Sequence, residues 1–124
     1  MNFLRGRLRG NNHVEVGSLT FTYEGSSGTA QQGNDVYLCI RPEDIVLTNN
    51  SNLGKQMNTV AATVRDTEFL GSIYRIRLAF ENYSDSEFVA QVPPANMRSL
   101  VLKSGAQVLV QFPIDRVRVY RRDT

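Results

Sequence analysis

Residues 36–47, with the sequence VYLCIRPEDIVL, combine a strand pattern with a proline corner. Apolar and other side chains alternate from Val36 to Ile40, which is the period of a strand that buries one face. Pro42 cannot donate a hydrogen bond to a sheet and holds the residue before it extended, so we expect the strand to end there. Alternation resumes after Asp44. The pattern predicts two short strands joined by a tight, charged corner.

The same alternation recurs in short runs along the whole chain. Residues rich in glycine, asparagine, serine or proline separate these runs and are typical of turns. Only residues 95–102 place apolar side chains at helical spacing, and there for no more than a turn. About ten short strands with this turn spacing predict an all-β barrel or sandwich. The predicted strands cover residues 4–9, 14–16, 19–23, 36–47, 60–65, 73–80, 87–92, 108–112 and 117–119.

Two polar segments interrupt the strand pattern. Residues 24–34 contain too little apolar surface to pack, so we expect a mobile loop there. Residues 49–58 mark the best boundary within the chain, because eight of these ten residues are polar or small and they precede the next strand pattern. We therefore expect either one domain of residues 1–124, or two small β halves that share one core, with halves at 1–48 and 59–124.

Composition excludes several classes of protein. A single cysteine, Cys39, rules out an internal disulfide, and with one histidine in the chain no ordinary structural zinc site is available. The apolar runs are far shorter than the roughly 20 residues that span a bilayer. The first residues lack the apolar core of a secretory signal, so we expect a reducing, cytoplasmic environment. The net charge of +2 does not by itself indicate a nucleic-acid partner.

Motifs for catalysis are missing from the sequence. The dipeptide Gly54–Lys55 is followed by Gln56, so it is no phosphate-binding loop of the G-x-x-x-x-G-K-[ST] type. The lone His13 stands beside a predicted turn, with no nucleophile-elbow sequence to complete a catalytic triad. Glu43 and Asp44 are adjacent at a corner and do not form a facing acid and base. We expect no enzyme activity from this chain alone.

A family resemblance appears in four runs that occur in the expected order. These runs are NFLRGRLRG near the start, CIRPEDIVL at 39–47, EFLGSIYRIRL at 68–78 and GAQVLVQFPIDRVRVY at 105–120. Together they resemble the transport-associated OB (TOBE) domain, the C-terminal domain of the ATP-binding subunits of ABC importers. The resemblance implies an OB-like barrel of short antiparallel strands, and it spans nearly the whole chain.

The resemblance also implies a function. In that family the ATPase domain precedes this domain, binds ATP and Mg²⁺, and supplies the catalysis. We therefore expect the present chain to be a fragment that needs no cofactor of its own. Its implied role is regulation and dimerisation within an importer, as a homodimer that works with the ATPase domain and the membrane permease subunits. That role places it at the inner face of the plasma membrane.

Two corners are the candidate sites for partner contact. We expect them to shape an interface and assign no chemistry to them. The first corner consists of Arg41, Pro42, Glu43 and Asp44, and the second of Phe69, Gly71 and Ser72. An alternative function is binding of a small oxyanion such as molybdate or sulfate, cradled by Ser72 and by backbone amides near Gly71, with help from Arg75.

Arginines on the predicted strands suggest a further alternative. Barrels of the OB type often bind single-stranded nucleic acid through basic grooves with stacking aromatic rings. In the sequence, Phe3 is the only aromatic residue in line with Arg5 and Arg7, while Tyr74 lies on the face opposite Arg75. Solvated strand faces explain such arginines more simply, because their aliphatic stems cover apolar surface. We expect no nucleic-acid partner.

Overall fold

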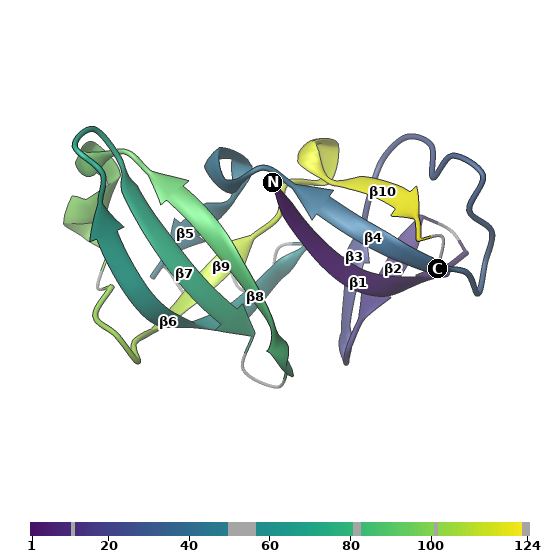
Figure 1. Cartoon of the computed structure of the whole chain (residues 1–124), viewed down its shortest axis with the longest axis horizontal. Helices are drawn as coiled ribbons and strands as arrows, with labels where there is room; N and C mark the ends of the chain where they lie inside the picture. Colours follow the sequence, from purple (N-terminus) through teal and green to yellow (C-terminus); the bar gives the residue numbers. More distant parts are fainter. Residues whose placement is uncertain (11, 50–56, 81–82, 101, 123–124) are drawn as a thin grey trace.

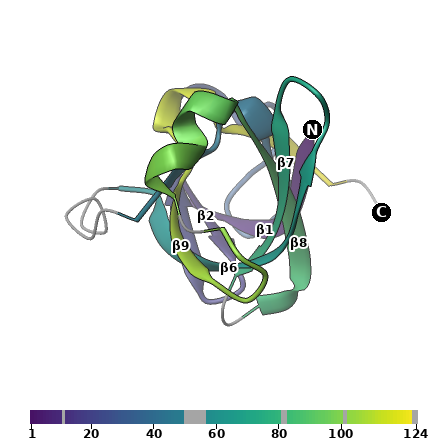
Figure 2. The same ribbon diagram turned by 90° about the vertical axis from the view of Figure 1, so that its left-hand side faces the viewer.

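Two five-stranded antiparallel sheets lie side by side along the long axis of the molecule (Figure 1). This computed structural model describes residues 1–10, 12–49, 57–80, 83–100 and 102–122. Seen along the long axis, the strands curl around a central core (Figure 2). The predicted all-β, OB-like architecture is confirmed. Within the described ranges, no helix has the length and apolar character needed to cross a membrane.

The first sheet has the strand order β10–β4–β1–β2–β3, and the second has the order β5–β9–β6–β7–β8. The strands of the first sheet are β1 (Asn2–Arg9), β2 (His13–Val16), β3 (Leu19–Thr22), β4 (Asp35–Ile40) and β10 (Arg118–Arg121). Those of the second sheet are β5 (Val46–Thr48), β6 (Thr59–Phe69), β7 (Tyr74–Phe80), β8 (Tyr83–Val92) and β9 (Gln107–Gln111). Short 3₁₀ turns occur at η1 (Pro42–Asp44), η3 (Pro94–Ser99) and η4 (Ile114–Arg116).

The chain contains two similar units, which are the strands β1 to β5 and the strands β6 to β10. Taken in chain order, β1 to β5 and β6 to β10 occupy equivalent places when the first sheet is laid on the second. The strand registers agree as well. Leu4 lies opposite Leu38 in the β1–β4 pair, and Val60 lies opposite Val110 in the β6–β9 pair. The fold is therefore a tandem repeat related by an approximate two-fold axis.

Each unit gives its last strand to the other sheet. Leu47 of β5 lies opposite Val110 of β9, and Val119 of β10 lies opposite Leu38 of β4. Consequently the sheets do not coincide with the sequence halves 1–48 and 59–124, because each half contains one strand that pairs in the other sheet. Of the predicted linker, residues 50–56 lie outside the described part of the chain.

One hydrophobic core joins the two sheets. Its largest fully buried side chains are phenylalanines that are 0–2% exposed. Phe21 of the first sheet stacks on Phe112, which follows β9, with ring centroids 5.0 Å apart. Phe88 packs edge-on against the same Phe112 ring at 5.5 Å and lies 4.7 Å from Phe80. Because rings from both units meet, the expectation of a shared core is confirmed.

Two buried asparagines, one at the start of each unit, tie the sheets together. The Asn2 side chain donates to the Val89 carbonyl and accepts from the Val89 amide, both at 2.8 Å. Asn58 does the same with Thr22 at 2.7 Å, and its Nδ2 also donates to the Phe112 carbonyl at 3.0 Å. Each asparagine thus satisfies the backbone of an edge strand in the other sheet.

The polar segment 24–34 is anchored more firmly than its composition predicts. The Gly33 amide donates to the Leu8 carbonyl at 2.7 Å, and the Leu8 amide donates to the Asn34 carbonyl at 2.9 Å. Ala30 belongs to the core and is 9% exposed. The two backbone bonds continue the β1–β4 pairing into the residues that precede β4.

Candidate functional site

The predicted corner at residues 41–44 forms η1, which carries the chain from β4 in the first sheet to β5 in the second. The Asp44 amide donates to the Arg41 carbonyl at 3.0 Å and closes the turn. Arg41 and Glu43 are exposed, Pro42 and Asp44 are half-buried, and Ile45 turns into the core. The corner therefore places its charged side chains at the junction of the two sheets.

The equivalent corner of the second unit is η4, which carries the chain back from β9 to β10. Its turn is closed by the Arg116 amide, which donates to the Pro113 carbonyl at 2.9 Å. Val117 then enters the core at the place that Ile45 takes in the first unit. Both crossovers use the same local geometry, because each must pass a chain between two curled sheets.

The second predicted corner is the tip of the β6–β7 hairpin. The Leu70 amide donates to the Ile73 carbonyl at 2.9 Å, and Gly71 has a φ of +94°, a conformation that favours glycine. Phe69 and Leu70 are 54% and 45% exposed. The Phe69 ring lies 4.8 Å from the Tyr74 ring, so the tip presents a small apolar surface to solvent.

The two predicted corners form separate surfaces. In Figure 1 the β6–β7 tip lies at the far end of the second sheet, whereas η1 lies between the sheets. The alternative oxyanion cradle is an open hairpin: Ser72 and Arg75 are both exposed, and a Cβ placed on Gly71 would meet nothing within 4 Å. Oxyanion binding by these residues stays a prediction.

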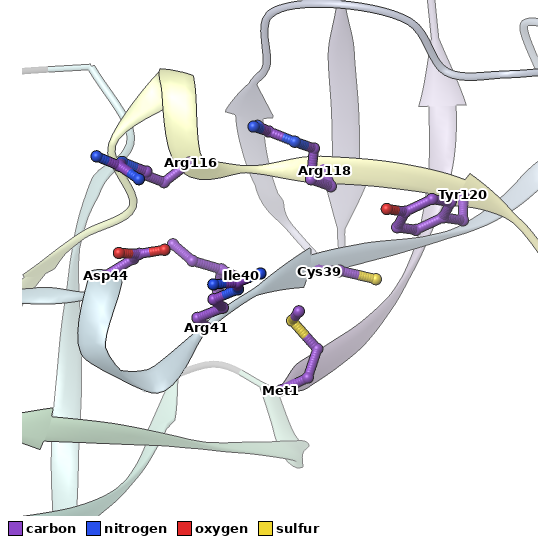
Figure 3. Close-up of a pocket in the computed structure, with 8 residues that line it drawn as sticks. All are labelled: Met1, Cys39, Ile40, Arg41, Asp44, Arg116, Arg118 and Tyr120. Carbon is purple, nitrogen blue, oxygen red and sulfur yellow. The ribbon is translucent and has the colours of Figure 1, made fainter.

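A pocket of about 250 Å³ opens where η1, η4 and β10 meet (Figure 3). Three arginines dominate it, and we call it the cationic pocket. Its lining consists of Met1, Cys39, Ile40, Arg41, Asp44, Arg116, Arg118 and Tyr120. Our sequence prediction included Arg41 and Asp44 but missed the β10 side, which is more than 70 residues further along the chain. The matching proline corners at 42 and 113 were the signal that could have paired them.

Hydrogen bonds fix part of this lining. The Arg118 Nη1 donates to the carbonyls of Asp115 at 2.8 Å and Val117 at 3.0 Å, which holds its guanidinium against the η4 turn. Arg116 Nε lies 3.9 Å from the Asp115 carboxylate. No ion pair joins Arg41 to another residue of the described ranges. The pocket thus retains unneutralised positive charge.

Cys39 forms part of the pocket wall and is 1% exposed. Burial raises the pKa of its thiol to about 11, because a thiolate would lose its hydration there. At neutral pH the thiol is protonated and contributes no charge. The described residues also contain no cluster of histidine, cysteine and acidic side chains that is suited to hold a metal ion.

The outer face of the first sheet corrects one interpretation drawn from the sequence. There Phe3 appeared to be the only aromatic residue in line with the arginines of β1. Strand pairing adds two more rings, because Arg5 lies opposite Tyr37, and Tyr37 lies opposite Tyr120. The Phe3 and Tyr37 rings meet edge-on at 6.0 Å. Aromatic and arginine side chains therefore do share a face, which extends from the cationic pocket.

Comparison with known proteins agrees with this architecture. A family model described as the TOBE domain matches residues 38–119, from the middle of β4 into β10. The chain belongs to this family. The match includes both crossover corners and the β6–β7 hairpin, which contain three of the four runs that carried the resemblance in the sequence, whereas the first run, NFLRGRLRG, lies outside it.

Two curated relatives are ATP-binding subunits. The TOBE chain is 26% identical to the Fe(3+) ions import ATP-binding protein FbpC 2 of Rhizobium meliloti over 88% of its length, and covers 29% of that protein. It is 28% identical to the sulfate/thiosulfate import ATP-binding protein CysA 2 of Chromobacterium violaceum over 96% of its length, and covers 31% of that protein. The chain thus spans about a third of these relatives.

A solved structure shares the fold. The cytoplasmic molybdate-binding protein ModG, determined with molybdate bound, superposes with a TM-score of 0.79 and covers 95% of this chain and 94% of its own. Sequence identity is only 16%, so the likeness concerns the fold alone. The superposition extends over nearly the whole of both chains, so the likeness includes both sheets of this chain.

Proposed function

We propose that this chain is the C-terminal regulatory and dimerisation domain of the ATP-binding subunit of an ABC-type importer. The observation that carries the proposal is the TOBE match combined with two relatives that are both importer ATP-binding proteins. ATP and Mg²⁺ would bind the ATPase domain of the parent subunit. The domain itself would perform no catalysis and would act at the inner face of the plasma membrane, through the assembled transporter.

Two surfaces of the second sheet support self-association. The hairpin tip exposes Phe69 and Leu70. On the outer face, a shallow hollow of about 240 Å³ includes Ala61 and Leu109 in its lining. Apolar surface contributes roughly 25 cal/mol per Å² when it is buried, before the cost of association is subtracted. Paired domains would hold two ATPase subunits together while the ATPase domains open and close.

A chimera tests the importer function directly. The C-terminal third of the iron-importer relative would be replaced by this chain, and ATP hydrolysis and Fe³⁺ uptake would be measured in reconstituted transporter. We expect substantial uptake from the chimera and reduced, uncoupled activity from a truncated subunit that lacks the C-terminal third. If the chimera transports no better than the truncation, the proposal is wrong.

Dimerisation has its own test. Sedimentation velocity of the 124-residue chain over a wide concentration range should reveal a monomer–dimer equilibrium. Replacing Phe69 and Leu70 by serine should weaken this dimer at least about tenfold, because two exposed apolar side chains contribute more than 1.4 kcal/mol when buried. Glu43→Lys tests the η1 corner in the same way. A dimer unaffected by either change would place the interface elsewhere.

A second candidate function is sensing of a small inorganic oxyanion at Ser72 and Arg75. The observation that favours it is the likeness in fold to a molybdate-binding protein. Molybdate, tungstate and sulfate should then raise the melting temperature of the chain, and Arg75→Gln should abolish the shift. Absence of any shift with all three anions would rule this candidate out.

A further inference from the structure

The repeat supplies an internal comparison for the cationic pocket. Strand registers assign equivalent positions, because Val119 opposite Leu38 in one sheet corresponds to Leu47 opposite Val110 in the other. The residues flanking Leu47 are therefore the counterparts of those flanking Val119. By the same registers, Val46 of β5 is equivalent to Arg118 of β10, and Thr48 of β5 is equivalent to Tyr120 of β10. Gln111 of β9 is equivalent to Cys39 of β4.

The two crossover turns, η1 and η4, also differ in charge at equivalent positions. The turn closed by Asp44 on Arg41 corresponds to the turn closed by Arg116 on Pro113, so Pro113 is the counterpart of Arg41. The equivalent site, which β9, β5 and the turn after Pro113 form, thus has proline, valine and threonine at the places of two arginines and a tyrosine. The fold does not require a cationic lining, and its presence at only one of these two equivalent sites indicates a ligand.

Charge and geometry define what that ligand must be. Three arginines and Asp44 belong to the lining, and the Asp115 carboxylate lies 3.9 Å from Arg116, so the arginines outnumber the neighbouring carboxylates by one. In Figure 3, Arg41 lies on the β4 side of the opening, with Arg116 and Arg118 on the β10 side. Guanidinium groups form paired hydrogen bonds with phosphate and carboxylate oxygens. A group with acceptors in several directions, such as a tetrahedral phosphate, suits donors on both sides.

The rest of the lining calls for an organic body. The pocket volume of about 250 Å³ is several times that of a bare phosphate, and Tyr120 and Met1 are 57% and 58% exposed beside it. A ring or short carbon chain would cover these apolar surfaces, and an arginine or aromatic side chain stacks well on a planar ring. We propose that the cationic pocket binds the dianion of a small organic phosphomonoester. The inference is independent of the importer function, since binding is a property of this chain alone.

Such a ligand would touch both crossovers at once. Arg41 and Asp44 belong to the passage from the first sheet to the second, and Arg116 and Arg118 belong to the return passage. Occupancy would therefore cross-link the two segments that join the units. Binding should raise the stability of the whole fold according to the ligand concentration relative to its Kd.

Calorimetric titration of the 124-residue chain with phenyl phosphate tests the proposal, with inorganic phosphate, phenol and a ten-nucleotide single strand of thymidine as further probes. We expect phenyl phosphate to bind at least about tenfold more tightly than inorganic phosphate, and phenol not to bind. Arg41→Gln should weaken binding about tenfold or more, the usual loss when one charged hydrogen-bonding partner is removed. The double change Arg118→Val and Tyr120→Thr, which copies Val46 and Thr48 of the equivalent strand β5, should abolish binding while the fold is retained.

Arg98→Gln, a change at an exposed arginine of η3, serves as the control of equal charge and should leave the Kd unchanged. Circular dichroism and melting temperature establish that each variant is folded. The proposal is overturned if phenyl phosphate does not bind at 10 mM, a concentration well above the usual range for specific sites, or if Arg98→Gln weakens binding as much as Arg41→Gln. Tighter binding of the oligonucleotide than of phenyl phosphate would also overturn it, and would assign the surrounding arginine and aromatic face to nucleic acid instead.

Discussion

At the scale of single residues, Gly6 shows how closely β1 and β2 approach. A Cβ added there would lie 2.6 Å from the Glu15 carbonyl oxygen and 2.8 Å from a Val14 methyl group. Since these atoms belong to a paired strand and a packed core, Gly6→Ala should lower the free energy of unfolding by about 1–3 kcal/mol. Gly10→Ala is the matched control, because its Cβ would meet only the flexible Gln32 side chain at 3.2 Å. Urea denaturation of both variants measures the difference, and equal losses would contradict the prediction.

The two asparagines that join the sheets differ in the number of bonds they make. Asn58 forms three side-chain hydrogen bonds with Thr22 and Phe112, whereas Asn2 forms two with Val89. Asn58→Ala should cost about 3 kcal/mol of unfolding free energy, and more than Asn2→Ala, because it leaves buried backbone groups unpaired. Asn58 also has a φ of +60°, which asparagine tolerates better than alanine. Chemical denaturation checks the order, with the exposed Asn49→Ala expected to be almost neutral.

The buried thiol predicts a stability change at high pH. An unfolded cysteine has a pKa near 8.5, whereas burial raises the pKa of Cys39 to about 11. Between these values the unfolded chain loses a proton that the folded chain keeps, so the free energy of unfolding should fall as pH rises through this window. We expect a loss of about 2 kcal/mol between pH 8 and pH 11. Because other groups titrate there, the measurement is the difference between the wild-type chain and Cys39→Ala, which should shrink with rising pH.

At the scale of secondary-structure elements, alternation predicted the strands well because each strand buries one face. The runs at 36–40 and 108–112 correspond to β4 and β9, and the prolines at 42 and 113 mark their ends. The segment 24–34 was less predictable. Its composition predicts mobility, but the backbone bonds from Leu8 to residues 33 and 34 anchor it, and backbone pairing leaves no trace in side-chain composition.

The candidate site shows a similar limit. The charged corner at Arg41–Asp44 was found from sequence because its residues are contiguous and proline marks the turn. The remaining pocket residues come from the first residue of the chain, from the end of β4, and from η4 and β10, which strand pairing brings beside β4. The same holds for Tyr37 and Tyr120, which neighbour Arg5 only through the registers of two strand pairs. A sequence shows the face that a side chain takes on its own strand, but not which strands are neighbours.

At the scale of the whole molecule, the exchange of strands makes the two units depend on each other. Without the partner unit, the first sheet lacks β10 and the second lacks β5. The core would lose Val117 and Val119 on one side and Ile45 on the other, all of them no more than 4% exposed in the intact fold. Fragments this small already bury too little surface to be stable with an incomplete core.

Fragment complementation tests this dependence. Residues 1–49 and 57–124, expressed separately, should each be unfolded by circular dichroism and amide proton dispersion, because each exposes core residues that the other unit covers. Mixed at equal concentrations, they should assemble into a 1:1 complex with the strand signature of the intact chain, since all ten strands are then present. The intact chain should unfold in one cooperative transition. If either fragment folds alone, the exchanged strands are dispensable and the units are independent domains.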